Sequence, residues 1–286
     1  MKLVAISDVH SNYIALQSAL KMVDEIKADG IIFLGDYVSD CPYPQNTMAL
    51  LYEYKNKYNC YFIRGNREEY FINYRKNSDK NWFYNSSTGS LLYTYENLTD
   101  TDLDFFESMP ICYDINIKGC PVITICHGSP ENTREEMKSK DILLDKYTKT
   151  INGEILLCGH THRSDVYHLN DKEVIFCPSV GLPQDRNSNF RILVLECVIG
   201  NDVWEHKFLE VPCDNEIIIT KFFESGLIEK APIWSRCIIK SIREQRDFPF
   251  QCLILAWEKA KAEGYTKNEV LPEKYWSEAA KELGII

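Results

Sequence analysis

The sequence predicts an α/β fold built on a mainly parallel sheet. In the first half of the chain, short apolar segments alternate with longer segments whose apolar residues recur at helical spacing. Several apolar segments end on Asp, Asn or His. The composition is that of an ordinary globular protein, with 45% apolar and 26% charged residues in a chain of 286. Collagen-like, low-complexity and wholly disordered chains are therefore excluded.

Short apolar runs bounded by turn residues predict the strands, because a strand buried on both faces is apolar throughout. From about residue 155 the runs follow one another without a clear helix between them. This change predicts an antiparallel portion or a second sheet. The predicted strands are residues 3–6, 31–34, 61–63, 122–126, 155–158, 174–177 and 192–197.

Helices are expected between the early strands, where residues 13–26 and 47–57 carry apolar side chains near a spacing of 3.6. The aromatic segment 68–110 is interpreted as a helical insertion whose rings pack over one side of the strand ends rather than form a base-stacking platform. Helical segments of balanced charge follow Pro212. We therefore divide the chain into a domain of residues 1–213 and a helical extension of residues 214–286.

The net charge of −10 indicates no basic surface, so neither non-specific nucleic-acid binding nor membrane binding is expected. The apolar run at the N-terminus is too short for a signal peptide or a membrane span. The eleven cysteines are an odd number and include no CxxC pair, which favours a reducing compartment. A cytoplasmic location is predicted.

Five successive strand ends carry residue types that bind metal ions. In parallel sheets, ligands collect beyond the carboxyl ends of the strands. A pair of divalent cations needs several such side chains and one carboxylate that can bridge both ions. Taken singly, Asp-x-His or Gly-Asp at a strand end is an ordinary turn or cap, but five such ends in order favour a metal site. The candidates are Asp8, His10, Asp36, Asn66, His127, His160 and His162.

In order and spacing, these motifs resemble those of the calcineurin-like metallophosphoesterases. The resemblance covers about residues 1–200 and is closest to the bacterial and archaeal branch of small phosphodiesterases. It implies a four-layer α/β/β/α sandwich of two packed sheets, followed here by a C-terminal helical appendage. The motifs are Asp8-Val9-His10, Gly35-Asp36, Gly65-Asn66, His127-Gly128 and Gly159-His160-Thr161-His162.

The resemblance also implies a centre of two divalent metal ions. Mn²⁺ is the expected metal, and Fe, Zn²⁺, Co²⁺ and Ni²⁺ are alternatives. The implied reaction is attack of a metal-bridging hydroxide on a phosphate ester. We expect Asp36, Asn66, Arg67 and His127 to be the catalytic residues. One ion would be held by Asp8, His10 and His162, the other by Asn66, His127 and His160, and Asp36 would bridge them.

The third motif departs from the family pattern, which usually has His after Gly-Asn. Here the sequence is Gly65-Asn66-Arg67-Glu68. Arginine cannot act as a general acid near neutral pH, because its pKa is above about 12. We therefore expect leaving groups that need no proton. Arg67 either grips a phosphate oxygen through its guanidinium or forms a salt bridge to Glu68, Glu69 or another surface acid.

Together these observations predict a dinuclear metal-dependent phosphoesterase, and a phosphodiesterase in particular. Its expected partner is a small phosphate ester, which can be nucleotide-like. One alternative is a phosphomonoesterase or nucleotide pyrophosphohydrolase that uses the same metals. Another is a non-catalytic metal-binding scaffold whose helical extension recognises a partner. The missing His of the third motif favours the scaffold, and the complete set of seven ligands favours the enzyme.

Overall fold

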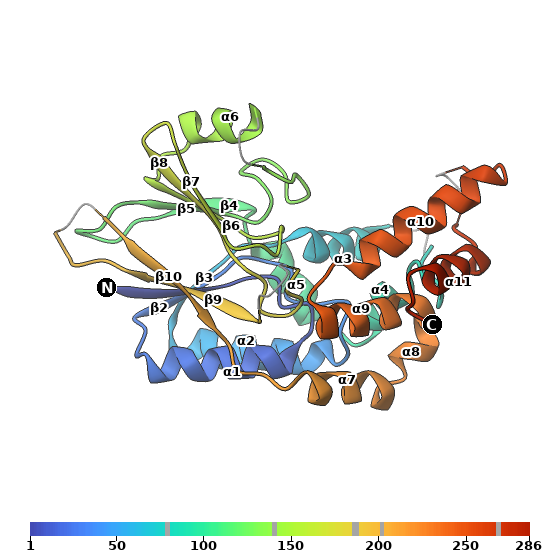
Figure 1. Ribbon diagram of the computed structural model, residues 1–286. Helices are drawn as coiled ribbons and strands as arrows, with labels where there is room; N and C mark the ends of the chain where they lie inside the picture. The colour runs from blue at the N-terminus through green and yellow to red at the C-terminus, as the bar shows by residue number, and fades with distance from the viewer. Residues whose placement is uncertain (78–80, 139–141, 185–188, 201–202, 267–269) are drawn as a thin grey trace.

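The computed structural model describes residues 1–77, 81–138, 142–184, 189–200, 203–266 and 270–286 (Figure 1). Within these residues the strands form two sheets of five strands each. The first sheet contains, in spatial order, β10 (Glu205–Glu210), β9 (Arg191–Glu196), β1 (Lys2–Ile6), β2 (Gly30–Phe33) and β3 (Asn59–Phe62). The second contains β4 (Cys112–Ile115), β5 (Ile123–Cys126), β6 (Ile155–Cys158), β8 (Lys172–Phe176) and β7 (Asp165–Leu169).

The centre of each sheet is parallel and in register, so several strands end at the same edge. In the first sheet, Ile6 pairs with Phe33, and Phe33 pairs with Phe62. In the second, Cys126 pairs with Cys158. The antiparallel strands lie outside these parallel cores: β9 and β10 in the first sheet, β4 and β7 in the second. The prediction of a second, partly antiparallel sheet is confirmed.

Alternating side chains of the sheets build the layers. Along β1, Leu3 and Ala5 belong to the apolar cluster between the two sheets, whereas Val4 and Ile6 face the helices outside the first sheet. Helices α1 (Tyr13–Glu25) and α2 (Pro44–Lys57) cover that outer face. Helix α6 (Ile142–Thr150) covers the outer face of the second sheet, so the α/β/β/α sandwich is confirmed (Figure 1).

The aromatic insertion is helical, as predicted, and consists of α3 (Asn66–Lys76), α4 (Gly89–Glu96) and α5 (Asp100–Ser108). Phe71 and Phe106 are fully buried in the main core. The Trp82 ring stacks on Tyr74 with centroids 4.0 Å apart. These aromatic side chains therefore serve packing. Residues 78–80 of the insertion lie outside the described part of the chain.

The C-terminal helices pack at the end of the sandwich where the parallel strands finish (Figure 1). Side chains such as Phe222 and Ile238 join the main apolar core, and Trp276 lies in a smaller core of the last helices. The division after residue 213 stays a prediction. The helices are α7 (Asn215–Glu224), α8 (Leu227–Lys230), α9 (Pro232–Glu244), α10 (Phe248–Ala262) and α11 (Glu273–Glu282).

Three strands and helix α6 have no counterpart in the sequence prediction, and the four-residue helix α8 falls between the helical segments predicted after Pro212. Strands β4, β7 and β10 all lie at sheet edges, where only part of each strand is buried. Charged and polar side chains interrupt their apolar pattern, which is how natural proteins protect edge strands. Helix α6 has only a few buried residues. Along the described residues, no helix is long and apolar enough to cross a membrane. The cytoplasmic location stays a prediction.

Two adjacent phenylalanines of α7 test how firmly the extension packs on the core. Phe222 is fully buried, whereas Phe223 is 68% exposed. Phe222→Ala is expected to lower the free energy of unfolding by about 3–5 kcal/mol, because it leaves a cavity. Phe223→Ala should change it by no more than about 0.5 kcal/mol. Urea denaturation measures both, and equal effects of the two substitutions would contradict this packing.

Candidate metal centre

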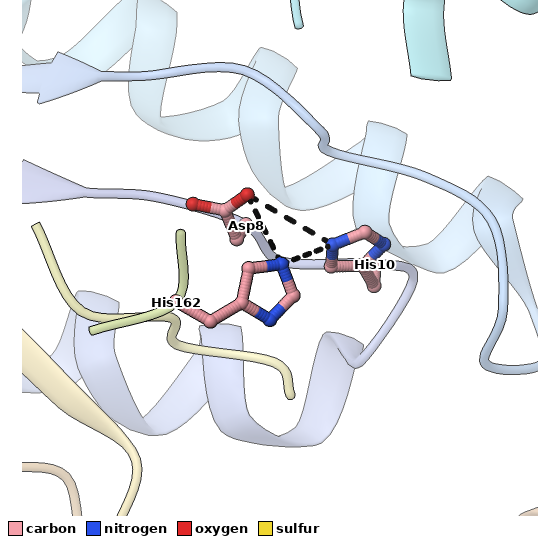
Figure 2. Close-up of side chains that lie close together, drawn as sticks. All are labelled: Asp8, His10 and His162. Carbon is pink, nitrogen blue, oxygen red and sulfur yellow. Dashed lines mark hydrogen bonds and ion pairs between the residues drawn. The ribbon is translucent and has the colours of Figure 1, made fainter. Parts of the chain in front are cut away.

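Side chains from both sheets meet where the parallel strands end. Asp8 and His10 follow β1 of the first sheet, and His162 follows β6 of the second. Figure 2 shows these three side chains turned toward one another, and one ligand atom from each lies within 4.8 Å of the other two. The packing of the two sheets produces this meeting, because the carboxyl ends of β1 and β6 lie at the same end of the sandwich. Asp8, Asp36 and His127 form a second such group that shares Asp8 with the first.

The imidazoles are oriented for coordination through Nε2. The Nδ1 of His127 lies 2.7 Å from the carbonyl oxygen of Leu34, and that of His162 lies 2.6 Å from the carbonyl oxygen of Leu182. An Nδ1–H bond to a carbonyl fixes the ring and leaves the Nε2 lone pair for a metal. The Nε2 atoms of His10 and His162 are 3.1 Å apart.

One oxygen of the Asp8 carboxylate accepts hydrogen bonds, and the other has none. Its Oδ2 accepts hydrogen bonds from the Ser7 hydroxyl and the backbone N–H of His160. Its Oδ1 is buried and has no hydrogen-bond partner, although the Nε2 of His162 lies 3.3 Å away and that of His127 4.0 Å away. Burial opposes its ionisation, but the neighbouring His162 and His127 hold its pKa at about 2. It is therefore an ionised carboxylate whose second oxygen faces the imidazoles.

This buried oxygen and its neighbours fit divalent metal ions. An unpaired buried carboxylate oxygen is costly, and cations remove that cost. Carboxylate and imidazole ligands together suit Mn²⁺, Fe, Zn²⁺, Co²⁺ and Ni²⁺. Both overlapping groups, centred on Asp8 Oδ1, meet this requirement.

Asp36 lies between the two groups. Its Oδ1 is 3.4 Å from Nε2 of His127, and its Oδ2 is 3.8 Å from Nε2 of His10. The backbone N–H of Arg67 donates to Oδ1 at 2.8 Å. Despite burial, the neighbouring His127, His10 and Arg67 keep the pKa of Asp36 well below its usual value. Asn66 Oδ1 lies 3.1 Å from Nε2 of His127, which places the amide at the same point.

His160 stands slightly apart from these groups. Its ring centroid is 5.1 Å from that of His127, and the two groups of closely placed ligand atoms do not include it. Burial, together with the neighbouring His127, lowers the pKa of His160 to about 4, so its imidazole is neutral as a metal ligand must be. All seven predicted ligands thus lie around one point, with His160 and Asn66 at its border.

The backbone is strained at most of these positions. Asp8, His10, Asp36, His160 and His162 all have positive φ angles, between 49° and 67°. Residues other than glycine rarely adopt this conformation, and such residues concentrate at functional sites. The surrounding fold holds these five residues, which lie at three strand ends, in this conformation, and this supports a functional origin.

Asp40 connects the site to two other parts of the molecule. Its Oδ2 lies 2.9 Å from Nδ1 of His10 and 3.0 Å from Nη2 of Arg67. Its Oδ1 accepts a hydrogen bond of 2.7 Å from the indole N–H of Trp234 in α9. Arg67 is thus paired with a buried acid. Glu68 instead accepts hydrogen bonds from the backbone N–H groups of Asp36, Tyr37 and Gly65.

A cavity of about 440 Å³ opens above the predicted ligands. His10, Asp36 and Asn66 line its floor, and Arg67 and Arg163 lie at its side. A larger hollow of about 650 Å³ lies near the amino ends of β6 and β8, and its lining includes none of the seven predicted ligands. The carboxyl end of the sheet is therefore the candidate active site, as expected for this class of fold.

Sequence analysis did not find the roles of Asp40 and Trp234. Asp40 lies four residues after Asp36, but nothing in the sequence pairs it with His10. Trp234 is almost 200 residues away along the chain, and its contact with Asp40 depends on how α9 packs.

Comparison with known proteins agrees with this geometry. Residues 1–164 match the family described as calcineurin-like phosphoesterase, which is more than half of the chain. The chain belongs to this family. The predicted enzyme class, a metallophosphoesterase that hydrolyses phosphoric esters, is thereby confirmed. Membership also implies divalent metal ions as cofactors and a phosphate ester as substrate.

The relatives extend the similarity beyond residue 164. Uncharacterized protein MJ0912 of Methanocaldococcus jannaschii is 25% identical over 248 residues, which cover 81% of this chain and 94% of that protein. Hypothetical protein PH1004 from Pyrococcus horikoshii OT3 has a TM-score of 0.68 at 20% identity, and the match covers 82% of this chain and 97% of that protein. A metallophosphoesterase from Sphaerobacter thermophilus has a TM-score of 0.64 at 19% identity, and the match covers 86% of this chain and 100% of that protein. These structures share the fold.

Gly65 tests how tightly the site is packed. A Cβ atom at this position would collide with the Asp36 carboxylate and lie 2.5 Å from the Asp36 backbone nitrogen. Gly65→Ala should therefore displace Asp36, lower the free energy of unfolding by about 1–3 kcal/mol and reduce metal content. Calorimetry and metal analysis measure these effects. Gly264→Ala, at a position with φ +91° and open space, serves as the control that strains the backbone away from the site, and similar metal loss in both variants would contradict the packing argument.

Proposed function

We propose that this protein is a dinuclear metal-dependent phosphodiesterase. The observation that carries the proposal is the pair of ligand groups sharing Asp8, whose buried Oδ1 faces the imidazoles without a hydrogen bond. When bound, two divalent cations supply the Lewis acid and the activated water that phosphate ester hydrolysis needs. Mn²⁺ is the metal and the cytoplasm the compartment that we propose.

The roles that we propose for the ligands are those implied by the family resemblance. We assign Asp8, His10 and His162 to one ion and Asn66, His127 and His160 to the other, with Asp36 between them. The distances from Asp36 to both His10 and His127 support its bridging role. Carbonyl bonds at Nδ1 of His127 and His162 keep these rings in place when substrate enters.

The preference for diesters rests on Arg67. Its guanidinium lines the cavity and lies within 3.9 Å of Asp36, but it cannot donate a proton to a leaving group near neutral pH. Asp36 and Asp40 raise its pKa further, in spite of its burial. Such a group binds phosphate oxygens and favours esters whose leaving group departs as a stable anion. This residue also contributes to substrate binding beside the metals.

Metal loading followed by hydrolysis assays tests the proposal. Protein stripped by a chelator and then supplied with Mn²⁺ should bind two ions per chain and melt at a higher temperature, since the ions bind the folded state. It should hydrolyse bis(p-nitrophenyl) phosphate faster than p-nitrophenyl phosphate. Asp36→Asn should lower kcat by more than about 100-fold, because even the hydrogen-bond partners of metal ligands contribute about 10- to 100-fold.

Asp104→Asn is the matched control, because Asp104 is 73% exposed and pairs with Arg75 on the surface. It should leave kcat unchanged. Faster hydrolysis of the monoester would make the protein a phosphomonoesterase. Two bound metals without hydrolysis of either ester would favour a binding scaffold over an enzyme.

The residue at position 67 should determine how strongly the rate of hydrolysis depends on the pKa of the leaving group. Arg67→His places a proton donor beside the metals, so rates on methyl aryl phosphates should depend less steeply on the pKa of the phenol. Arg67→Lys keeps the charge without supplying a donor that titrates near neutral pH, and it should retain the steep dependence. If the rate depends equally steeply on the pKa of the phenol in the wild type and in the His variant, Arg67 does not determine the preference for the leaving group.

A further inference from the structure

One wall of the catalytic cavity comes from the helical extension. Helices α9 and α10, from the far end of the sequence, contribute to the lining of this cavity. Most of the side chains they contribute are apolar, whereas the floor consists of imidazoles and carboxylates. The wall residues are Trp234, Ile238, Asp247, Pro249, Phe250 and Leu253.

Trp234 fixes this wall relative to the metal ligands. Its indole N–H donates to Asp40 Oδ1 at 2.7 Å, and the other oxygen of Asp40 lies 2.9 Å from Nδ1 of His10. On the opposite side, the Trp234 ring packs edge-on against Trp276, which is buried in the core of the last helices. A short series of contacts therefore holds the wall at a set distance from the floor.

The exposed part of the wall is apolar and close to the start of α10. Phe250 is 57% exposed although it lines the cavity, and Leu253 lies one turn further along the same helix. The wall offers few polar groups to a ligand, because the Asp247 carboxylate already accepts the backbone N–H of Phe250 at 3.1 Å as the helix cap. The Trp234 N–H is likewise engaged by Asp40.

A cavity whose floor would be cationic when it holds metal ions, and whose wall is apolar, suits a ligand with two unlike ends. Its volume of about 440 Å³ can hold a phosphate group and a ring side by side. Sugar hydroxyls would find few hydrogen-bond partners on the wall, whereas an uncharged ring would cover the exposed apolar atoms of Phe250 and Leu253.

We propose that Ile238, Phe250 and Leu253 form a subsite for an aromatic or similarly large apolar group on the substrate phosphate ester. The inference rests on the proposed phosphoesterase function and names the substrate class for the same site. The apolar group lies on the wall while its phosphate occupies the floor. The helical extension thereby determines specificity.

Binding of two phosphonates tests the subsite without requiring turnover. Mn²⁺-loaded protein should bind phenylphosphonate about tenfold more tightly than methylphosphonate in calorimetric titrations, because only the phenyl group reaches the wall. Phe250→Ala combined with Leu253→Ala should abolish this preference and leave the Kd for methylphosphonate within about twofold. If wild type binds both phosphonates equally, or the double variant keeps the preference, the subsite is overturned.

Two surface variants provide matched controls. Ile254→Ala changes an apolar residue that is 44% exposed on α10 but does not line the cavity, and Phe223→Ala removes an exposed ring on α7. Both should keep the tenfold preference. If the double variant has a lower melting temperature or a lower metal content than the wild type, the single variant Phe250→Ala tests the subsite instead. Its exposed ring contributes little to the stability of the fold.

Hydrolysis assays separate the two proposals. Esters of phenyl and methyl groups with the same leaving group should differ in kcat/KM in parallel with the phosphonate affinities. Hydrolysis of both esters without any phosphonate preference leaves the proposed function standing and removes the subsite. A phosphonate preference without hydrolysis of any ester supports the subsite and removes the proposed function.

Discussion

The structure of the site depends on the contacts that the buried Asp8 carboxylate makes with residues of both sheets. Asp8 follows the central strand of one sheet, and its neighbours His127, His160 and His162 all follow strands of the other. The backbone N–H of His160 and the Ser7 hydroxyl occupy one oxygen, which leaves the second facing the imidazoles. An ionised carboxylate at this depth is stable only among cationic or metal partners, so the site and the packing of the two sheets stabilise each other.

The contacts between the sheets outside the metal ligands serve the same arrangement. Ser7 forms an isolated bridge with Ser179, and the backbone N–H of Gly181 donates to the carbonyl oxygen of Asp8. A Cβ at Gly181 would collide with the carbonyl oxygen of Val9. This close approach of two loops explains why a glycine is needed there. Strained φ angles at five predicted ligands persist because these contacts determine the backbone from several sides.

The helical extension is part of the site as well as of the core. Phe222 and Ile238 pack into the main apolar cluster, and Trp234 reaches Asp40 beside a predicted metal ligand. The buried Asp40 carboxylate joins His10, Arg67 and Trp234, three residues from distant parts of the chain. In this protein, therefore, the fold surrounding the candidate metal centre extends beyond the residues that match the family.

The sequence by itself determined the alternation of strands and helices, the positions of all seven predicted ligands at strand ends, and the unusual Arg67. These features are local, because an apolar run and the polar residue that ends it are adjacent in the chain. Edge strands such as β10 escaped prediction because burial of one face leaves a weak pattern. Only the tertiary structure decided that Arg67 pairs with Asp40 and that α9 and α10 wall the cavity. Such contacts depend on how helices pack across nearly 200 residues of chain, and no local spacing encodes that packing.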